Sequence, residues 1–364
     1  MAKNKILVLA EDYPNNNGGI SLMYIHTRIF YYQMNGLDVT VLNFRADMGY
    51  IYNGIKVITY KEYRNEDVKY TLLILHAANL KHHYKFLKKY GNRFFGYIFF
   101  YHGHEVLRIN KSYSKPYPYI RKSKLKEISQ DIYDSFKLFM WRQYLPKIVS
   151  KSQYVFVSIW MRKNFLRYTK ISEKTISGRN YITYNCVGEQ FEKGKYNPET
   201  DKEYDFITIR GNLDGSKYAV DIVNRIANNT PECSFLLYGK GKFFEFNEKA
   251  SNLKWIDKTL SHQEIIKILQ KSRYALMPTR TDAQGLMMCE MAAFGIPVIT
   301  SDIDVCHEVF DGFENVFFIN NDDPILSLSS FKKRKSICKK DTRFYKKETI
   351  GRELDLIKSL LIDL

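Results

Sequence analysis

The feature that most constrains the fold is the regular alternation of short apolar runs with longer stretches of helical character. In the first half a strand at 6–10 is followed by a polar loop at 11–19, a helix at 20–35 and a strand at 39–44. Three more strands follow at 70–75, 94–101 and 154–158. Gly36 is a suitable stop for the predicted helix. Strands that alternate with helices indicate a parallel sheet covered on both faces, so we predict an α/β fold.

The same order restarts after a polar stretch at 192–204, which we interpret as a linker. Strands and helices alternate there in the order 206–210, 219–228, 234–238, 253–256, 263–270, 274–277, 286–294 and 297–300. A chain of 364 residues is long enough for two domains. We therefore predict one Rossmann-like domain at 1–196 and a second at 197–344. Ligands of such sheets bind at the carboxyl ends of the strands, which predicts a cleft where two such domains face each other.

The charge predicts an anionic partner. Lys and Arg number 56 against 39 Asp and Glu, a net charge of +17. Residues 81–126 hold twelve cations and twelve Tyr or Phe against Glu105, and residues 332–347 hold nine cations against Asp341. One interpretation is a solvated face; the other is a surface that binds anionic lipid, with aromatic side chains at the interface. Nucleic acid is not expected, because no helix-turn-helix, zinc-finger or RNP pattern is present.

The absence of certain sequence features predicts where in the cell the protein lies and whether it binds a metal. No apolar run approaches the length of a spanning helix, and the apolar run near the N-terminus is too short for a signal peptide. Five scattered cysteines without a C-x-x-C pair indicate reduced thiols, at positions Cys186, Cys233, Cys289, Cys306 and Cys338. We expect a cytoplasmic protein without a metal site, and attachment to the inner face of the membrane stays open.

The most informative segment is 277–299, Met-Pro-Thr-Arg-Thr-Asp-Ala-Gln-Gly-Leu-Met-Met-Cys-Glu-Met-Ala-Ala-Phe-Gly-Ile-Pro-Val-Ile. A strand ends at its start, a polar loop ends at Gly285, and a helix follows until Gly-Ile-Pro ends it. The helix N-terminus offers unpaired N–H groups for a phosphate or a sugar oxygen. Asp282 precedes this terminus and Glu290 lies inside the helix, so the two acids can flank one ligand. A helix with one buried Glu is the structural alternative.

This segment resembles the signature of the retaining glycosyltransferases of family four, in which an acid and a Glu are separated by seven residues before a small-residue helix and G-x-P-V-I. Here the first acid is Asp282, where the family usually has Glu. The resemblance implies that Asp282 and the N–H groups of Gly285, Leu286 and Met287 hold the donor sugar. It implies that Glu290 accepts hydrogen bonds from the ribose hydroxyls.

Further matches follow in the family's order. Gly18 and Gly19 lie in the first strand-to-helix loop, where glycines let N–H groups approach a diphosphate. Arg210 and Lys217 follow the first strand of the second domain, and the resemblance implies that they clamp the diphosphate. Two surface cations are the alternative. Weaker matches are the turn at Gly239 and the segment 255–259, which would meet the base and ends at Thr259.

In the first domain, His102 resembles the family's strand-end His-Gly, whose histidine reaches the transferred sugar. We favour His102 over His104 because Gly103 follows it directly; a buried core histidine is the alternative. Residues 155–158 and 184–187 resemble the family's interdomain strand and N-G-V turn, with Cys186 in place of Gly. The resemblance also implies the GT-B fold, in which two doubly wound domains face each other and a last helix, here 349–361 within 345–364, packs back on the first.

The implied activity is retaining transfer of a hexosyl or N-acetylhexosaminyl group from a nucleotide-sugar, UDP-linked by family frequency. The acceptor would be a glycan or a lipid-linked precursor in surface polysaccharide or glycoconjugate synthesis. The implied catalytic residues are His102, Arg210, Lys217 and Asp282, with no cofactor besides the donor and no metal. The alternatives are a GT-B sugar phosphorylase or epimerase, and a non-catalytic basic protein that binds membrane or nucleic acid.

Overall fold

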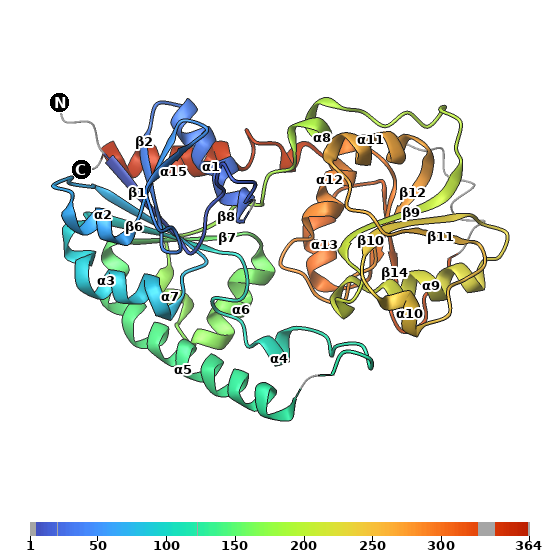
Figure 1. Ribbon diagram of the computed structural model, residues 1–364, viewed down its shortest axis with the longest axis horizontal. Helices are drawn as coiled ribbons and strands as arrows, with labels where there is room; N and C mark the ends of the chain where they lie inside the picture. Colours follow the sequence, from blue (N-terminus) through green and yellow to red (C-terminus); the bar gives the residue numbers. More distant parts are fainter. Residues whose placement is uncertain (1–4, 20, 122, 327–338, 363–364) are drawn as a thin grey trace. The chain divides into compact units, whose positions relative to one another are not determined.

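Two compact units divide the chain in the computed structural model, which describes residues 5–19, 21–121, 123–326 and 339–362 (Figure 1). The first unit comprises Met1–Arg108, Ile132–Asn185 and Thr349–Leu364, and the second comprises Ile109–Asp131 and Cys186–Glu348. Each unit contains its own sheet.

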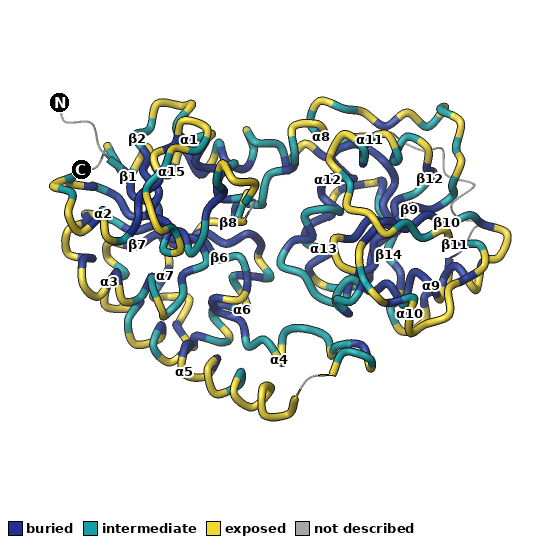
Figure 2. Tube along the Cα trace, in the orientation of Figure 1, coloured by how far each residue is buried: buried dark blue, intermediate teal, exposed yellow. Residues whose placement is uncertain are grey.

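The sheet of the first unit has the order β3-β4-β2-β1-β5-β6-β7-β8. Its strands are β1 (Lys5–Ala10), β2 (Asp38–Asn43), β3 (Tyr50–Tyr52), β4 (Ile55–Ile58), β5 (Leu72–His76), β6 (Gly96–Tyr101), β7 (Ser152–Phe156) and β8 (Asn180–Ile182). All neighbours pair in parallel except β3 with β4. The central strands β5 and β6 are buried except for Gly96 at the start of β6 (Figure 2), as expected for a sheet covered on both faces.

Helices lie on both sides of this sheet (Figure 1). They are α1 (Met23–Met34), α2 (Tyr60–Asn65), α3 (Lys85–Tyr90), α5 (Lys124–Ile148), α6 (Ile159–Thr169), α7 (Glu173–Ile176) and α15 (Ile350–Ile362), with short turns η1 (Leu80–Tyr84), η2 (Gly91–Arg93) and η3 (Val149–Lys151). The division between the units falls within α5, whose first residues are grouped with the second unit.

A buried ion pair attaches the last helix to the first. Arg28 of α1 donates from Nε to both carboxylate oxygens of Glu353 on α15, each at 3.1 Å, and both side chains are almost fully buried. Tyr32 donates to the same carboxylate at 2.6 Å. Arg28 Nη2 also donates to Asn185 Oδ1 at 2.9 Å, at the end of the unit's second segment. The predicted last helix therefore packs on the first unit.

The second sheet has the order β11-β10-β9-β12-β13-β14, and every pair in it is parallel. The strands are β9 (Tyr204–Asn212), β10 (Phe235–Lys240), β11 (Leu253–Ile256), β12 (Ser272–Leu276), β13 (Val298–Ser301) and β14 (Val316–Ile319). In sequence order this is 3-2-1-4-5-6, the doubly wound arrangement whose direction reverses between the first and fourth strands. That reversal lies between β9 and β12.

The second unit's helices again lie on both sides of its sheet (Figure 1). They are α4 (Ile109–Ser112), α8 (Glu189–Lys193), α9 (Val220–Asn229), α10 (Phe243–Phe246), α11 (His262–Gln270), α12 (Leu286–Phe294) and α13 (Asp304–Phe310), with turns η4 (Ser216–Tyr218) and η5 (Thr342–Phe344). Within the described residues, no helix of either unit is long and apolar enough to cross a membrane.

The division differs from the predicted boundaries in two places. It falls at Asn185 and Cys186 rather than at 196 and 197, because α8 packs against α11 and α12 of the second unit. Residues 109–131 also belong to the second unit, since Tyr117 is buried in its core and donates to Asp221 at 2.8 Å. The prediction assumed that each domain is one continuous stretch of sequence. Residues 109–131 instead join the second unit through contacts such as those of Tyr117.

The predicted elements otherwise agree with the structure to within a few residues. The helix predicted at 20–35 is α1, which begins at Met23; residue 20 lies outside the described residues. Gly36 has φ 88°, the left-handed conformation that ends a helix. The predicted linker at 192–204 begins inside α8. The prediction missed the β3–β4 hairpin, β8, β14, the helices α5, α6 and α13, and the short helices α2, α3, α4, α7, α8 and α10.

The buried ion pair makes a stability prediction. We expect Glu353→Ala to lower the free energy of unfolding by about 3–5 kcal/mol, because it leaves the Arg28 guanidinium buried without its carboxylate. Asp355→Ala, an exposed acid on the same helix, should change it by less than about 0.5 kcal/mol. Urea unfolding of the three proteins measures this, and equal midpoints for both variants would contradict it.

Candidate functional site

Several residues predicted for the donor come together at the point where the strand order of the second sheet reverses. Arg210 lies near the end of β9, Lys217 follows in η4, and the loop 278–285 leads from β12 to α12. Doubly wound sheets bind ligands at this place. These residues therefore lie at one edge of the second sheet, and their roles toward a donor stay predictions.

Arg210 is a buried cation with unused hydrogen-bonding capacity. It is 7% exposed, and its Nη2 donates to the Pro278 carbonyl oxygen. Its Nε has no hydrogen-bond partner in the described part of the chain. Burial lowers the pKa of Arg210 to about 10, and the nearby Asp282 opposes that shift, so the guanidinium stays protonated at neutral pH. An anion that reached it would satisfy a charge that is costly to bury.

Lys217 is held by its backbone while its ammonium group remains without an acidic partner. Its carbonyl oxygen accepts hydrogen bonds from Arg280 N at 2.9 Å and from Thr279 Oγ1 at 3.0 Å. Its Nζ lies 4.7 Å from the ring centre of Tyr218 and 5.8 Å from that of Tyr113. No carboxylate among the described residues forms an ion pair with it. The loop after β12 thus fixes the turn that carries this cation.

Arg280, which the sequence interpretation missed, completes this attachment. Its guanidinium forms two hydrogen bonds with the Asp221 carboxylate, at 2.8 and 2.5 Å, and donates to Ser216 O at 2.9 Å. Because Asp221 neutralises Arg280, this cation serves structure, whereas Arg210 and Lys217 form no ion pair within the described residues. Sequence alone offers three cations here and no means of telling the paired one from the others.

Gly239 is required by close packing between β10 and β9. A Cβ atom at this position would lie 2.5 Å from the Arg210 carbonyl oxygen and 2.6 Å from Leu213 Cδ2. Trp255 Nε1 donates to the Gly239 carbonyl oxygen at 2.9 Å. The glycine therefore acts through the position of Arg210. Thr259, predicted near the base, is exposed in the loop after β11.

The N-terminus of α12 is left without a side-chain cap. Gly285 precedes the helix with φ 76°, and no acidic residue lies in the first turn. Asp282 Oδ1 accepts from Ala283 N at 2.8 Å, within the preceding loop, rather than from the helix. The N–H groups of Leu286 and Met287 lie in the first turn, where an α-helix has no internal acceptors. The end of this helix can accept an anion or a sugar oxygen.

Glu290 is a buried carboxylate with weak partners. It is 3% exposed, accepts from Gly188 N at 3.4 Å, and lies 3.5 Å from His262 Nε2. Burial raises its pKa to about 7, although the Gly188 N–H opposes this. Burial also lowers the pKa of His262. An acid that is kept in apolar surroundings with free acceptor capacity is suited to hydroxyl groups of a ligand. Gly188 and His262 were missed, because they lie on other elements, far along the chain.

The first unit contains a histidine cluster at the end of its own strands. His102 follows β6; its Nε2 lies 3.2 Å from His76 Nδ1, and its ring centre lies 4.7 Å from that of Tyr24. Burial and then the nearby Arg28 hold the pKa of His102 well below its ordinary value. Glu105 accepts hydrogen bonds from the His102 and Gly103 N–H groups, which fixes the turn. His102 is therefore a neutral imidazole at physiological pH.

The two glycines predicted to approach a diphosphate lie in the loop after β1. Gly19 N already donates to Asn15 Oδ1 at 3.2 Å, while Gly18 is exposed with φ 87°.

The sequence interpretation missed a set of hydrogen-bonded polar side chains that connects the ends of β1 and β5. Glu11 accepts from Asn79 at 2.8 Å and lies 2.7 Å from His82 Nδ1.

The four cysteines within the described residues are free thiols, and Cys338 lies outside them. In the same part of the chain, no group of three or more His, Cys, Asp or Glu side chains is placed to hold a metal ion.

A family model described as glycosyl transferases group 1 matches residues 206–328, wholly within the second unit. The matched segment includes most residues predicted for the donor, among them Arg210, Lys217, Asp282 and Glu290. No curated protein matches the chain by sequence.

Solved structures share the fold of the whole chain. Sucrose-phosphate synthase from Thermosynechococcus elongatus is similar with a TM-score of 0.69 and 11% identity, covering 100% of both chains. HepE from Anabaena, solved with UDP and glucose, has a TM-score of 0.65 and 12% identity over 99% of this chain and 100% of its own. WaaG, a glycosyltransferase involved in lipopolysaccharide biosynthesis, has a TM-score of 0.60 and 13% identity over 97% of this chain and 99% of its own. The predicted GT-B fold is thus confirmed, and the glycosyltransferase class of enzyme is supported.

The raised pKa of Glu290 makes a prediction about stability and pH. Between its ordinary value of 4.5 and about 7 the folded protein binds more protons than the unfolded chain, so the free energy of unfolding falls as pH rises through this window. We expect Glu290→Gln to stabilise the protein at pH 8.5 by roughly 2–3 kcal/mol, and by less at pH 5.5.

Glu264→Gln is the control of opposite sign. In the wild-type protein the pKa of Glu264 is lowered to about 2, chiefly by the hydrogen bond from Lys258, so Glu264→Gln should not gain stability at pH 8.5. Thermal unfolding at both pH values measures the difference. A gain for Glu290→Gln that is the same at pH 5.5 and 8.5 would contradict the prediction.

Proposed function

We propose that this chain is a retaining glycosyltransferase, of the family-four type, that takes its sugar from a UDP-linked donor. The observation that carries the proposal is the pair of cations Arg210 and Lys217, which form no ion pair within the described residues and are attached to the same loop that ends at the uncapped N-terminus of α12. A sugar linked to a diphosphate would satisfy all three. The family model over 206–328 and the UDP seen in HepE support this choice of ligand.

In this proposal each group has a separate task. Lys217 and Arg210 bind the diphosphate, while the Leu286 and Met287 N–H groups and Asp282 hold the sugar. Glu290 accepts hydrogen bonds from the ribose hydroxyls, for which its ionised form is the better acceptor. Gly239 acts through Arg210, and Gly18 and Gly19 would add N–H donors if Asn15 releases Gly19. Thr259 is the proposed contact with the base.

The chemistry is cleavage of the bond between the anomeric carbon and the diphosphate. Negative charge grows on the leaving phosphate, and fixed cations and N–H dipoles directed at it lower the barrier. Asp282 and the neutral His102 would stabilise positive charge that develops on the sugar. The acceptor hydroxyl attacks from the side of the leaving group and its proton passes to the departing phosphate oxygen, so that configuration is retained. We propose that the protein's own cations carry out the charge stabilisation without a metal ion.

The acceptor is proposed to be a glycan or a lipid-linked precursor of a surface polysaccharide or glycoconjugate, and the transferred group a hexosyl or N-acetylhexosaminyl unit. The role of WaaG in lipopolysaccharide biosynthesis supports an acceptor of this kind.

Donor binding is tested by thermal unfolding with a panel of nucleotide-sugars. A bound donor at about 100 times its Kd should add about 2.7 kcal/mol and raise Tm by several degrees. Lys217→Ala should abolish this shift, because the diphosphate loses a fixed cation. Lys267→Ala removes an equal charge from an exposed position on α11 and should keep the shift. If no nucleotide-sugar stabilises the wild-type protein, the proposed donor site is wrong.

Retention is tested by following donor hydrolysis without an acceptor. With a UDP-α-sugar, proton NMR at early times should show the α-anomer of the free sugar, and EDTA should leave the rate unchanged. A β-anomer as first product would overturn retention, and loss of the rate in EDTA would overturn metal independence. Cleavage that requires inorganic phosphate would instead identify a phosphorylase.

A further inference from the structure

The long helix α5 carries an apolar stripe on its exposed face. Five side chains recur at spacings of three and four positions, which places them on one side of the helix: Leu125, Ile128, Ile132, Phe136 and Phe139. Each is between 55% and 78% exposed. From first to last they extend over about 21 Å of the helix. Figure 2 shows the long exposed run of α5.

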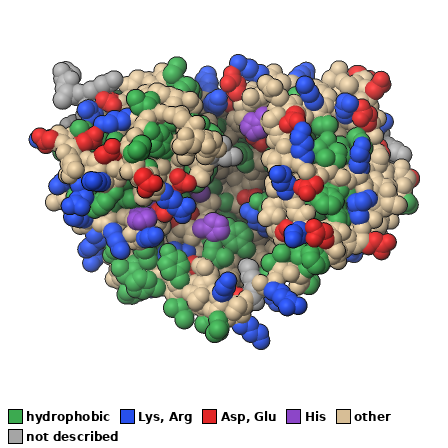
Figure 3. All heavy atoms as spheres, viewed as in Figure 1, with side chains coloured by type: hydrophobic (Ala, Val, Ile, Leu, Met, Phe, Trp, Pro, Cys, Tyr) green, Lys and Arg blue, Asp and Glu red, His purple; other side chains and the backbone are tan. Residues whose placement is uncertain are grey.

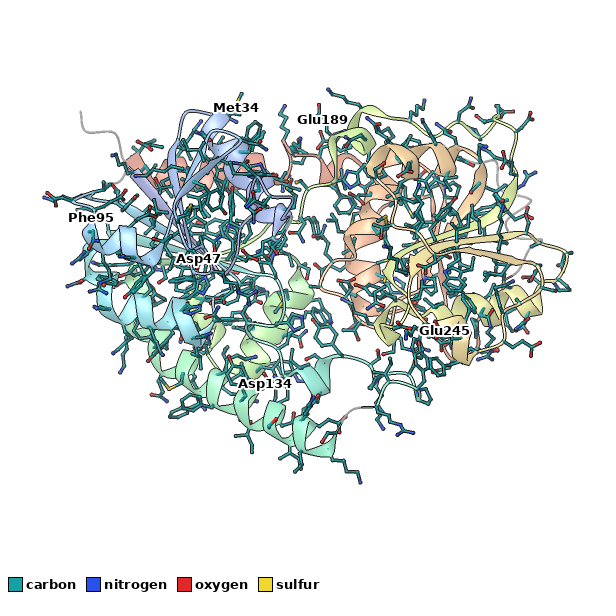
Figure 4. The ribbon with its side chains drawn as sticks, in the orientation of Figure 1. Met34, Asp47, Phe95, Asp134, Glu189 and Glu245 are labelled. Carbon is teal, nitrogen blue, oxygen red and sulfur yellow. The ribbon has the colours of Figure 1, made fainter. Side chains whose placement is uncertain are left out.

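The opposite face of α5 is already used for packing. Its buried residues are Asp134, Lys137, Leu138, Trp141 and Leu145, and Figure 4 labels the first of these on the helix. Asp134 and Lys137 form a buried ion pair at 2.7 Å. The apolar stripe is therefore additional to what the fold needs, and nothing in the described part of the chain covers it.

Cations border the stripe. Arg142 and Lys147 are exposed on α5 itself. The neighbouring helix α3 adds the exposed Lys85, Lys88 and Lys89, and Lys88 Nζ lies 5.7 Å from the ring centre of Tyr144 on α5. Lys124 and Lys126 are exposed where α5 begins. Figure 3 shows hydrophobic side chains over α5 with Lys and Arg side chains beside them.

The nearby acids do not neutralise this border. Glu105, the one acid between residues 81 and 126, is buried. Glu127 and Asp131 point away from the stripe and line a cavity with the segment 109–121. The stripe thus combines exposed aliphatic and aromatic side chains with a positively charged edge.

The expectation of aromatic side chains at an interface within 81–126 is corrected by the structure. Most of the aromatic residues from 86 to 101 are core residues, and Phe95 is the one that is strongly exposed, as labelled in Figure 4. The second basic stretch, 332–347, does not support a lipid-binding surface either. Its residues 332–338 lie outside the described part of the chain. Of its other cations, Lys340 donates to two carbonyl oxygens, and Arg343 lies 2.6 Å from Asp341.

We propose that α5 binds an anionic membrane surface, with the stripe inserted among lipid chains near the headgroups and the flanking cations on the phosphates. A stripe of large apolar residues with a basic border is what an interfacial helix requires. A second copy of this chain would bring an equally positive border to the same place, which opposes self-association. This surface does not depend on the proposed function, because none of its residues belongs to the donor site.

Vesicle flotation of the full chain tests the proposal. Wild-type protein should float with phosphatidylcholine vesicles that contain 30% phosphatidylglycerol, and at least about tenfold less with phosphatidylcholine alone or at 0.5 M NaCl. Ile132→Ser/Phe136→Ser/Phe139→Ser should reduce binding to the anionic vesicles by at least about tenfold. Lys88→Gln/Lys89→Gln should reduce it severalfold.

The matched control is Met48→Ser/Ile51→Ser, which removes two similarly exposed apolar side chains in and just before β3, an edge strand of the first unit's sheet. It should bind as the wild type does, and all variants should keep the wild-type unfolding temperature within a few degrees. Equal binding of the triple variant, or equal binding to neutral and anionic vesicles, would overturn the proposal. So would a wild-type dimer that the triple variant converts to a monomer without any vesicle binding, since the stripe would then join two copies.

Discussion

The second unit holds two cations beside the β12–α12 loop, Arg210 and Lys217, that form no ion pair with a carboxylate among the described residues, although Asp282 lies near Arg210. In the part of the chain that the structure describes, Arg210 is buried with an unpartnered Nε, and Lys217 is positioned through its carbonyl oxygen while its ammonium group forms no ion pair. A third cation, Arg280, is neutralised by Asp221 and fixes the turn that carries Lys217. The fold thus maintains positive charge where the strand order reverses, which is costly unless an anion binds there.

Much of this arrangement could be predicted from sequence because it follows from local order along the chain. The apolar runs give the strands, and the Gly285 to Gly295 segment gives a helix with an open N-terminus. Residues at strand ends, such as Arg210 and His102, must then lie at one edge of each sheet. The resemblance to a known signature added roles that spacing alone cannot assign, and the roles of individual site residues stay predictions.

What could not be predicted depends on contacts between distant positions. Gly188 and His262 approach Glu290 from two other helices, so the carboxyl group's raised pKa has no sequence signal. Residues 109–131 join the second unit through Tyr117 and Asp221, against the chain order. The stripe on α5 did have a signal, the spacing of Leu125, Ile128 and Ile132. Its apolar residues face outward, and this can be judged only once the opposite face is seen to be buried.

A crystal structure of the protein with UDP tests the central claim most directly, because it locates the diphosphate. The account predicts phosphate oxygens within hydrogen-bond distance of Lys217 Nζ and the Arg210 guanidinium, and ribose hydroxyls that donate to Glu290. The α12 N-terminus should lie next to the same diphosphate. UDP bound elsewhere, or bound with Glu290 still in contact only with Gly188 and His262, would contradict the account.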